Sequence, residues 1–496
     1  MDIVETIRAK ARRSDVAWFT FLVLSGLLLT WLAIVQSLVF LVLVAVVALT
    51  AFTPWAIVRA RRIDLELWQW MLLAALSGYM LLNYGFENLT LHLGLPFIVS
   101  YAMIYGSLAL AVHRHPSLMI KAAKNPAMIC LLILIFQTFI HLIVDLPKYG
   151  LWAIRDSTIV LDGLFLALGL LWAMKQSNLL ILMKWLMGFF ILDLAYSYTL
   201  PWGAALQSVS PKSGVFQEVA LVGNYRGNVL YLLIGALFCL LLANYVVRWP
   251  RWVLMLLAVA QIFGLAIEQA RAMYVGLVLA LIVLALAGKA RDSLKLASIL
   301  CLALVPLLFL TVTGIEIQGR IGTVNMDFLS EHMKSITGAR DTPGSTNEGR
   351  MDWYEQAYQK YRKHPWIGVG FGEPLLDVEN SQSTAIRMPH NSSFSILVRL
   401  GAIGFIFWVI FHLYVVKTFI YALRQRKRYD KQIADVVLWL FLCYLVFMIE
   451  ISVEAGLEFP SGAVPFYFFV GLALGLIRFQ PSARRITGLA NDAQKA

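Results

Sequence analysis

Long apolar runs, separated by short polar segments, recur along the whole chain. A helix needs about 20 consecutive apolar residues to cross the hydrocarbon core of a bilayer, so these runs predict about fourteen transmembrane helices, within a range of about twelve to fourteen. The pattern therefore indicates an all-α polytopic membrane protein. The expected spans lie near residues 16–34, 38–58, 67–83, 96–112, 126–145, 157–174, 178–197, 228–247, 252–270, 272–288, 294–313, 391–417, 433–450 and 462–478.

Lysine and arginine are distributed unevenly between alternate loops. The segments RARR (59–62) and RQRKRYDK (424–431) are strongly basic, as are both ends of the chain, whereas the loops near 84–95 and 451–461 contain no lysine or arginine. Basic loops remain on the cytoplasmic side of a membrane. We therefore expect an even number of spans, both termini in the cytoplasm, and the charge-poor loops on the outer side.

One outer loop, over residues 314–390, is long enough to fold outside the membrane. Its segment GRMDWYEQAYQKYRKHPW places apolar and aromatic side chains at helical spacing and ends near Pro365, which predicts an amphipathic helix. We expect this helix to lie on the outer membrane–water boundary. The chain is therefore divided into N-terminal transmembrane helices (1–220), a core that contains the long loop (221–480) and a cytoplasmic tail (481–496).

The overall composition excludes a soluble enzyme, a disordered chain and a disulfide scaffold. Hydrophobic residues make up 60% of the chain and charged residues only 14%, against about 45–50% and about 25% in soluble domains. The net charge of +12 then reflects cytoplasmic loops, and no nucleic-acid partner is expected. The four cysteines lie in apolar runs without metal-ligand spacing, and nucleotide motifs are absent, so we expect no metal and no cofactor. The glycine-rich GVGFGE (368–373) is interpreted as a turn.

Two arginines on the outer side depart from the general distribution of positive charge. Arg271 lies in a short turn between two spans, and Arg226 lies where a long outer loop re-enters the membrane. A guanidinium binds phosphate through a planar pair of donors and stays charged when half-buried, so the two residues could hold a diphosphate. Alternatively, Arg271 is an interfacial anchor or pairs with Glu268, three residues earlier. Arg350 and Arg387 could contact an anionic head group or remain solvated.

His390 lies where the long outer loop enters the next span. A neutral imidazole can accept a proton near neutral pH, which suits general-base chemistry. The nearest charged residues in the sequence are Arg387 and Arg399, and cations would favour the neutral ring. Alternatively, His390 is one of several polar residues at the start of a helix, where Asn391 or Ser392 provides the cap.

Acidic residues at or near membrane depth form a third set of candidates. Ionisable groups there are costly and are functional candidates by default, and an ion-coupled transporter would use them. Most lie near the ends of expected spans, which favours ordinary polar contacts instead. His141 and His412, within spans, are expected to bond to neighbouring helices. The acidic set comprises Asp145, Asp162, Asp193, Glu268, Glu450, Glu454 and Glu458.

Several of these features occur in an order that resembles one known family. An arginine turn, QARAMYVG (269–276), precedes a long outer loop that contains Arg350 and HPWIGVGFG (364–372), and the loop closes with PHNSSFSILVRLGAIG (389–404). Over residues 220–480 the chain thus resembles the O-antigen ligase/polymerase superfamily, integral membrane glycosyltransferases of the GT-C type.

This resemblance implies a glycan donor linked to undecaprenyl diphosphate, used without metal or nucleotide on the periplasmic face of the bacterial inner membrane. It implies that His390 orients or deprotonates an acceptor hydroxyl, which attacks the anomeric carbon with inversion, and that Arg271 and Arg226 hold the diphosphate. Further substrate contacts would be Arg350, Arg387 and Glu268.

The identity of the acceptor remains open at this point. A ligase would transfer the glycan to lipid A-core or a similar lipid, and a polymerase would transfer it to another lipid-linked repeat unit; membrane lipids are partners in either case. An ion-coupled transporter, the alternative from another class, would transfer no glycan.

Overall fold

The computed structural model describes residues 65–93, 95–225, 227–327, 330, 346–376 and 387–479. The chain divides after Glu66, and all helices and strands reported below belong to the part that begins at Leu67. The expected spans 16–34 and 38–58 and the expected cytoplasmic tail (481–496) lie outside the described residues.

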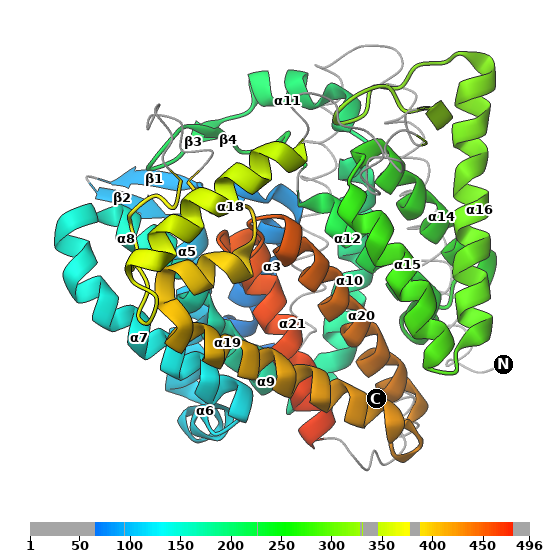
Figure 1. The fold of residues 1–496 in the computed structure, drawn as a ribbon. Helices are drawn as coiled ribbons and strands as arrows, with labels where there is room; N and C mark the ends of the chain where they lie inside the picture. Colours follow the sequence, from blue (N-terminus) through cyan, green and yellow to red (C-terminus); the bar gives the residue numbers. More distant parts are fainter. Residues whose placement is uncertain are drawn as a thin grey trace. The chain divides into compact units, whose positions relative to one another are not determined.

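Helices dominate the described part of the chain, and Figure 1 shows their arrangement. The longer α-helices are α3 (Leu67–Leu82), α5 (Val99–Arg114), α7 (Pro126–Tyr149), α8 (Leu151–Leu161), α10 (Gln176–Ser197), α12 (Asn228–Leu241), α14 (Arg251–Glu268), α15 (Arg271–Leu286), α16 (Ala290–Thr313), α18 (Thr346–Lys363), α19 (Ser392–Arg424), α20 (Lys431–Val453) and α21 (Pro460–Phe479). The shorter elements are α4 (Tyr84–Glu87), α6 (Pro116–Ala123), η1 (Asp162–Phe165), α9 (Leu166–Ala173), η2 (Leu200–Trp202), α11 (Gly203–Val209), α13 (Ala243–Val246) and η3 (Arg426–Arg428), with the strands β1 (Thr90–Leu93), β2 (Leu95–Ile98), β3 (Lys212–Ser213) and β4 (Val219–Ala220).

Every span expected within the described residues falls on helical segments, although 157–174 and 228–247 are each divided between two α-helices. Eight helical segments of this part are long and apolar enough to cross a membrane, and α3, α12 and α15 are shorter apolar helices. The span that contains Asp162 is interrupted by the 3-10 turn η1 between α8 and α9. The fold is thus that of a mainly helical polytopic membrane protein, whereas the total of about fourteen spans stays a prediction.

Helix α21 lies in the middle of the packed helices and crosses α9 at very short range (Figure 1). A Cβ atom added to Gly169 would lie 2.1 Å from the carbonyl oxygen of Phe468, and one added to Gly471 would lie 2.0 Å from that of Leu166. Small residues let two membrane helices approach closely, where dispersion contacts hold them together. These glycines therefore set the helix crossing around which the rest of the fold packs.

Two short antiparallel hairpins lie in loops that are predicted to be on the outer side, an addition to the all-α architecture expected from the sequence. Strand β1 pairs with β2 and β3 pairs with β4. The hairpins meet where the N–H of Thr90 donates to Ser213 Oγ at 2.8 Å, and Ser213 Oγ donates to Thr90 O at 3.0 Å. Helix α4 precedes the first hairpin and carries the buried Glu87, whose Oε2 accepts from Ser461 Oγ at 3.1 Å.

Glu87 gives the fold a pH dependence. Burial raises its pKa from 4.5 to about 7, and the positive charge of Arg155 and the bond from Ser461 only partly oppose this. The folded protein therefore holds a proton that the unfolded chain releases near pH 4.5, so its stability is greatest below that value and is lost as pH rises to about 7. The loss amounts to about 3 kcal/mol, at about 1.4 kcal/mol for each pKa unit.

Replacing Glu87 should remove this dependence. Glu87→Gln keeps the acceptor for Ser461 but cannot ionise, so we expect its thermal unfolding temperature in detergent to fall less than that of the wild type between pH 5 and pH 8. The exposed Glu316→Gln is the matched control and should follow the wild type. Parallel pH profiles for Glu87→Gln and the wild type would contradict the assignment.

The glycine-rich segment 368–373 is a turn, as predicted, and it fits a kink in α19. Gly401 interrupts the helical backbone with φ 67° and ψ −171°, so peptide groups near it need partners outside the helix. The turn supplies them, since the N–H groups of Val369 and Gly370 donate to carbonyl oxygens just before the kink, both at 3.0 Å. Three glycines of the turn have positive φ, which suits residues without a Cβ: Gly368, Gly370 and Gly372.

Gly401 should not tolerate a side chain. A Cβ there would lie 2.4 Å from the carbonyl carbon of Trp366, and the positive φ adds backbone strain. We expect Gly401→Ala to cost about 1–3 kcal/mol, measured as a lower unfolding temperature in detergent. Gly188→Ala is the control, because nothing lies within 4 Å of a Cβ there, and it should leave stability unchanged or raise it. Equal temperatures for the two variants would contradict the strain argument.

Helix α18 confirms the amphipathic helix predicted in the long outer loop. Its Ala357 is fully buried and packs with Leu375 and Val398 of the neighbouring segments. The predicted apolar face is only partly covered, because Met351 and Tyr358 remain 66% and 45% exposed. The placement of this helix on the membrane boundary stays a prediction.

Candidate functional site

The arginine turn between α14 and α15 is held rigidly by a second turn of the chain. Gln269 ends α14 in a left-handed conformation with φ 55°, and Arg271 begins α15. The Gln269 amide Oε1 accepts from the N–H groups of Ile321 and Gly322 at 2.6 and 3.0 Å, and its Nε2 donates to the carbonyl oxygen of Gly322 at 2.8 Å. The position of Arg271 is therefore fixed by residues about fifty positions further along the chain.

Arg320 belongs to the same turn and was missed by the sequence analysis. Its Nε donates to the carbonyl oxygen of Glu268 at 3.0 Å, and its N–H donates to that of Ile267 at 3.2 Å. The argument that singled out Arg271, a cation on the outer side, applies equally to Arg320. That position was passed over because it lies within a long loop and not in a turn between spans.

The alternative pairing of Arg271 with Glu268 is not found. Within the described part of the chain, the Arg271 side chain has no carboxylate at ion-pair distance and no hydrogen bond. The carboxyl group of Glu268 is buried, with Oε1 lacking a hydrogen-bond partner among the described residues. The positive charge of Arg320 interacts electrostatically with this carboxyl group.

Positive charge accumulates around Arg271. The guanidinium groups of Arg350 and Arg320 both repel that of Arg271, and Arg350 repels it more strongly than Arg320 does. Repulsion between these like charges raises the free energy of the ligand-free protein. An anion bound between the arginines would lower that free energy. Three arginines from α15, α18 and the 319–322 turn thus form one cationic cluster, defined here as Arg271, Arg320 and Arg350.

His390 is linked to this cluster through one carboxylate. Its Nδ1 lies 3.1 Å from Glu454 Oε2, and Glu454 Oε1 lies 3.6 Å from Nη2 of Arg350. The imidazole ring faces the indole of Trp353, with 5.3 Å between centroids and 32° between planes. His390 is 9% exposed and has the unusual φ of 51°. Because a non-glycine residue rarely adopts such a backbone, the local structure holds the ring in a defined place.

The capping alternative for this segment is explained without His390. Asn391 is the N-cap of α19, and its Oδ1 accepts from the N–H of Phe394 at 3.0 Å. Ser392 Oγ accepts from the N–H of Leu457. Asn391 therefore provides the cap, as that alternative expected, and His390 directly precedes it.

The expectation that cations surround His390 is wrong. Arg387 and Arg399 are its nearest charged neighbours in the sequence, but both bind Asp156 Oδ2, at 3.4 and 3.0 Å. The charged group at Nδ1 is instead the carboxylate of Glu454, 64 residues further along the chain. Sequence proximity failed here because Arg387, in the loop before α19, and Arg399, on α19, both contact Asp156 of α8.

Asp156 is the centre of a separate buried ionic group. Arg155 also binds it, at 3.0 Å, and the Arg399 side chain is only 1% exposed. Arg387 further donates to the carbonyl oxygen of Gly372 at 2.7 Å and stacks on the indole of Trp152, 4.0 Å from its centroid. Protein groups thus bind Nη2 of Arg387, while its Nε has no hydrogen-bond partner among the described residues; a contact of Arg387 with substrate stays a prediction. In the sequence, the adjacent charged residues Arg155 and Asp156 next to an apolar run could have indicated this ionic group.

The remaining buried acids have separate partners in different parts of the fold. Asp145 accepts from the N–H of Phe371, Asp162 from Tyr105 Oη, Asp193 from Asn228 Nδ2 and Glu458 from Ser395 Oγ, at distances of 2.5 to 3.1 Å. Such isolated pairs are typical of structural hydrogen bonding. Glu450 also has an interaction partner. Glu268 and Glu454, the other two acids of the set, are described above.

Of the two histidines within spans, His412 bonds to a neighbouring helix, as expected, whereas His141 bonds to a turn of the long loop. His141 Nε2 lies 2.9 Å from the carbonyl oxygen of Ile367, and His412 Nδ1 lies 2.8 Å from Tyr444 Oη. Among the described residues, no group of three or more histidine, cysteine or acidic side chains could hold a metal ion. Arg226, the second expected diphosphate ligand, lies outside the described residues.

The comparison with known proteins bears on this part of the chain. Residues 254–409 match the family model described as O-antigen ligase. The matched segment contains Arg271, Arg320, Arg350 and His390 and ends before Glu454. No curated protein matches the chain. The resemblance to the O-antigen ligase superfamily is thus confirmed, and it rests on residues 254–409.

Proposed function

We propose that this protein is a ligase-type membrane glycosyltransferase that moves a glycan from undecaprenyl diphosphate to a hydroxyl group of a lipid acceptor, lipid A-core or a similar molecule. The family match supports a ligase- or polymerase-type membrane glycosyltransferase. The proposed diphosphate donor and hydroxyl acceptor rest on one observation. The cationic cluster of Arg271, Arg320 and Arg350 is joined through Glu454 to His390. One half of this site suits a diphosphate and the other half suits a hydroxyl group.

The cationic cluster would act on the leaving group. When the bond between the anomeric carbon and the diphosphate oxygen breaks, negative charge grows on the diphosphate. Guanidinium groups placed in advance stabilise that charge by about 1.5–3 kcal/mol for each charge-assisted hydrogen bond. Because three cations lie near one another here, the protein's own residues would supply the stabilisation that a divalent metal provides elsewhere.

His390 would act on the acceptor. The carboxylate of Glu454 accepts a hydrogen bond from Nδ1–H, which places the lone pair on Nε2. That lone pair takes the proton of the acceptor hydroxyl while its oxygen bonds to the anomeric carbon. The diphosphate departs from the opposite face, so the anomeric configuration inverts, and the proton is on His390 when undecaprenyl diphosphate leaves. Glu454 is then a positioning residue that also stabilises the imidazolium.

We place this site on the periplasmic face of the inner membrane, because the loops near 84–95 and 451–461 lack basic residues. Single cysteines at Glu355 of α18 and Lys427 of the basic loop test this. A membrane-impermeant maleimide should label only Glu355→Cys in intact spheroplasts and both variants after permeabilisation. Labelling of both positions before permeabilisation would refute the topology.

Transfer itself is tested with purified protein in liposomes that contain a glycan linked to undecaprenyl diphosphate. We expect glycan on lipid A-core, with release of undecaprenyl diphosphate and no inhibition by a metal chelator. Product on a second lipid-linked repeat unit instead would identify a polymerase, the alternative within the superfamily. Absence of transfer to either acceptor, with flux that depends on an ion gradient, would favour a transporter.

A further inference from the structure

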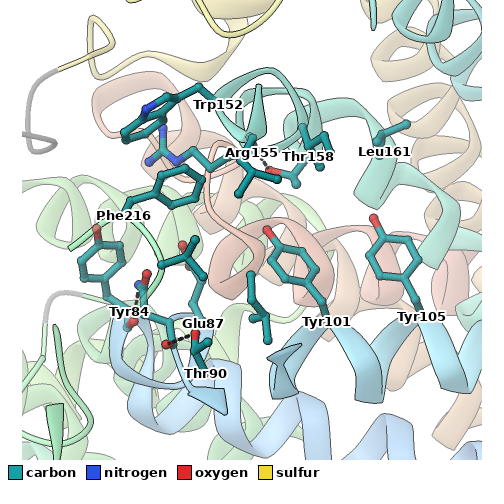
Figure 2. A pocket seen from close by; sticks show the side chains of 15 residues that line it. Tyr84, Glu87, Thr90, Tyr101, Tyr105, Trp152, Arg155, Thr158, Leu161 and Phe216 are labelled. Atoms are coloured by element: carbon teal, nitrogen blue, oxygen red, sulfur yellow. Dashed lines mark hydrogen bonds between the residues drawn. The ribbon is translucent and has the colours of Figure 1, made fainter. Parts of the chain in front are cut away.

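A second site lies on the same side of the fold as the outer hairpins. A cavity of about 420 Å³ opens between α5 and α8 and is bordered by α4, the first hairpin and the loop that carries Phe216. Figure 2 shows Tyr101 and Tyr105 of α5 on one side, and Arg155, Thr158 and Leu161 of α8 across from them. This volume falls within the range of small-molecule sites in proteins. We call it the α5–α8 cavity.

The α5–α8 cavity changes character along its length. Tyr84, Trp152 and Phe216 surround the end near the outer loops. The ring centroids of Trp152 and Phe216 are 4.2 Å apart. The other end is closed by Tyr105, which donates to Asp162 at 3.1 Å. Aromatic side chains with one polar edge are typical of the membrane interface. The cavity therefore leads from interfacial residues into the helices.

Part of the cavity wall faces the surface that a membrane would cover. Leu151 and Ile154 line the cavity and are 53% and 43% exposed. On the preceding helix α7, Ile143 and Val144 are 76% and 69% exposed. Exposed apolar side chains on the spans of a polytopic protein are expected to contact lipid. A hydrocarbon chain can therefore enter the α5–α8 cavity sideways from the bilayer.

The interfacial end of the cavity favours an anion. Arg155 lines it, and this arginine shares the single carboxylate of Asp156 with Arg387 and Arg399. The carboxyl groups of Glu87, which lines the cavity, and Glu458 also interact with Arg155, but burial raises the pKa of both. Together with Asp156 they therefore offset the three guanidinium groups only in part. Trp152 contacts two of them, with its ring centroid 4.0 Å from the guanidinium carbon of Arg387 and 5.7 Å from that of Arg155. These stacked groups hold the positive charge at the cavity entrance.

We propose that the α5–α8 cavity binds the lipid acceptor, with one hydrocarbon chain between α5 and α8 and a phosphate group beside Arg155. This inference rests on the proposed function, because only a transferase between two lipids needs a second lipid site. The donor diphosphate would lie at Arg271 on α15, which is on the right in Figure 1, whereas the cavity lies on α5 and α8, which are on the left. The two lipids would thus approach His390 from different sides.

One short segment of the chain connects the cavity to His390. Glu454 bonds to His390, and Phe459 lies 5.1 Å from the guanidinium carbon of Arg155 and 5.5 Å from the Tyr84 ring. Phe459 is five positions after Glu454, so their Cα atoms are at most about 18 Å apart. A head group that extends from the cavity by a few sugar rings can therefore reach the histidine.

The proposal is tested by filling the cavity. Thr158 is 3% exposed and borders the cavity, so Thr158→Trp should block the chain site. We expect the KM for the acceptor to rise about tenfold or more, the loss expected when about two methylene groups leave an apolar site, with the KM for the donor unchanged. Ile140→Trp, at a position 52% exposed on α7, is the control. If Thr158→Trp fails to fold, Leu151→Trp narrows the entrance at an exposed position.

A lipid probe separates failure of this proposal from failure of the proposed function. Phosphatidic acid with a diazirine on its acyl chain, in phosphatidylcholine vesicles, should label α5 and α8 of the wild type and not of Thr158→Trp. Lipid A-core or a lipid-linked repeat unit should displace it at lower concentration than phosphatidylglycerol does. Equal displacement by phosphatidylglycerol would identify a bulk phospholipid site and overturn the acceptor assignment, as would absence of label. Labelling with the expected displacement, but no transfer to any acceptor, would refute the proposed function alone.

Discussion

His390→Ala should abolish glycan transfer while the protein still inserts, folds and binds its lipid-linked donor. General-base catalysis contributes about 10²–10⁴-fold, so the rate of product formation should fall by that factor at saturating donor and acceptor. The donor should still bind, because its diphosphate is held by the arginines and not by the imidazole. The measurement is a full time course of product from purified donor and acceptor in liposomes, together with direct binding of the labelled donor.

The matched control is His364→Ala. His364 is exposed and lies in the same outer segment, so its loss should leave the rate unchanged. Glu454 provides a second test of the arrangement. Glu454→Gln keeps an acceptor for Nδ1–H and should be impaired less than Glu454→Ala, for which we expect a loss of about 10–100-fold, as for other residues that orient a functional histidine. Near-normal transfer by His390→Ala would remove the histidine from the mechanism and leave the arginines to explain catalysis.

The spans could be predicted because the signal for each is local. A membrane helix must satisfy its backbone within itself and present apolar side chains over its whole length, so a run of residues is sufficient to recognise it. The same holds for the amphipathic helix α18 and for the cap at Asn391. The turn at 368–373 was predicted from its glycines, but its partner, the kink at Gly401, was not.

The links between these elements could not be predicted, because each depends on residues far apart in the chain. Glu454 reaches His390 across 64 positions, and Gln269 reaches Ile321 across 52. The expectation for His390 failed for this reason, since neighbouring cations in the sequence proved to be partners of Asp156. Arg271 was predicted between two spans and is the first residue of the second of these helices, whereas its cationic neighbours became visible only in the folded protein.

Arg271→Ala should have an effect as large as that of His390→Ala but of a different kind. Loss of about two charge-assisted hydrogen bonds to the leaving diphosphate, at about 1.5–3 kcal/mol each, corresponds to about 10²–10⁴-fold in rate. Because the same contacts exist in the bound donor, the KM for the donor should rise as well. Removing one of three converging cations also relieves repulsion in the ligand-free protein, so Arg271→Ala should be at least as thermally stable as the wild type.

Arg271→Lys distinguishes a bidentate contact from simple charge. Lysine keeps the positive charge, but its ammonium group cannot donate two parallel hydrogen bonds as the planar guanidinium does. We therefore expect Arg271→Lys to recover only part of the rate lost in Arg271→Ala. Arg291→Ala, at an exposed position on α16, is the control for loss of an arginine elsewhere and should transfer glycan normally. The donor analogue to compare is undecaprenyl monophosphate, whose binding should depend less on Arg271 than that of the diphosphate. If the Ala and Lys variants both keep full transfer and donor affinity, Arg271 is an interfacial anchor and the diphosphate must be held elsewhere.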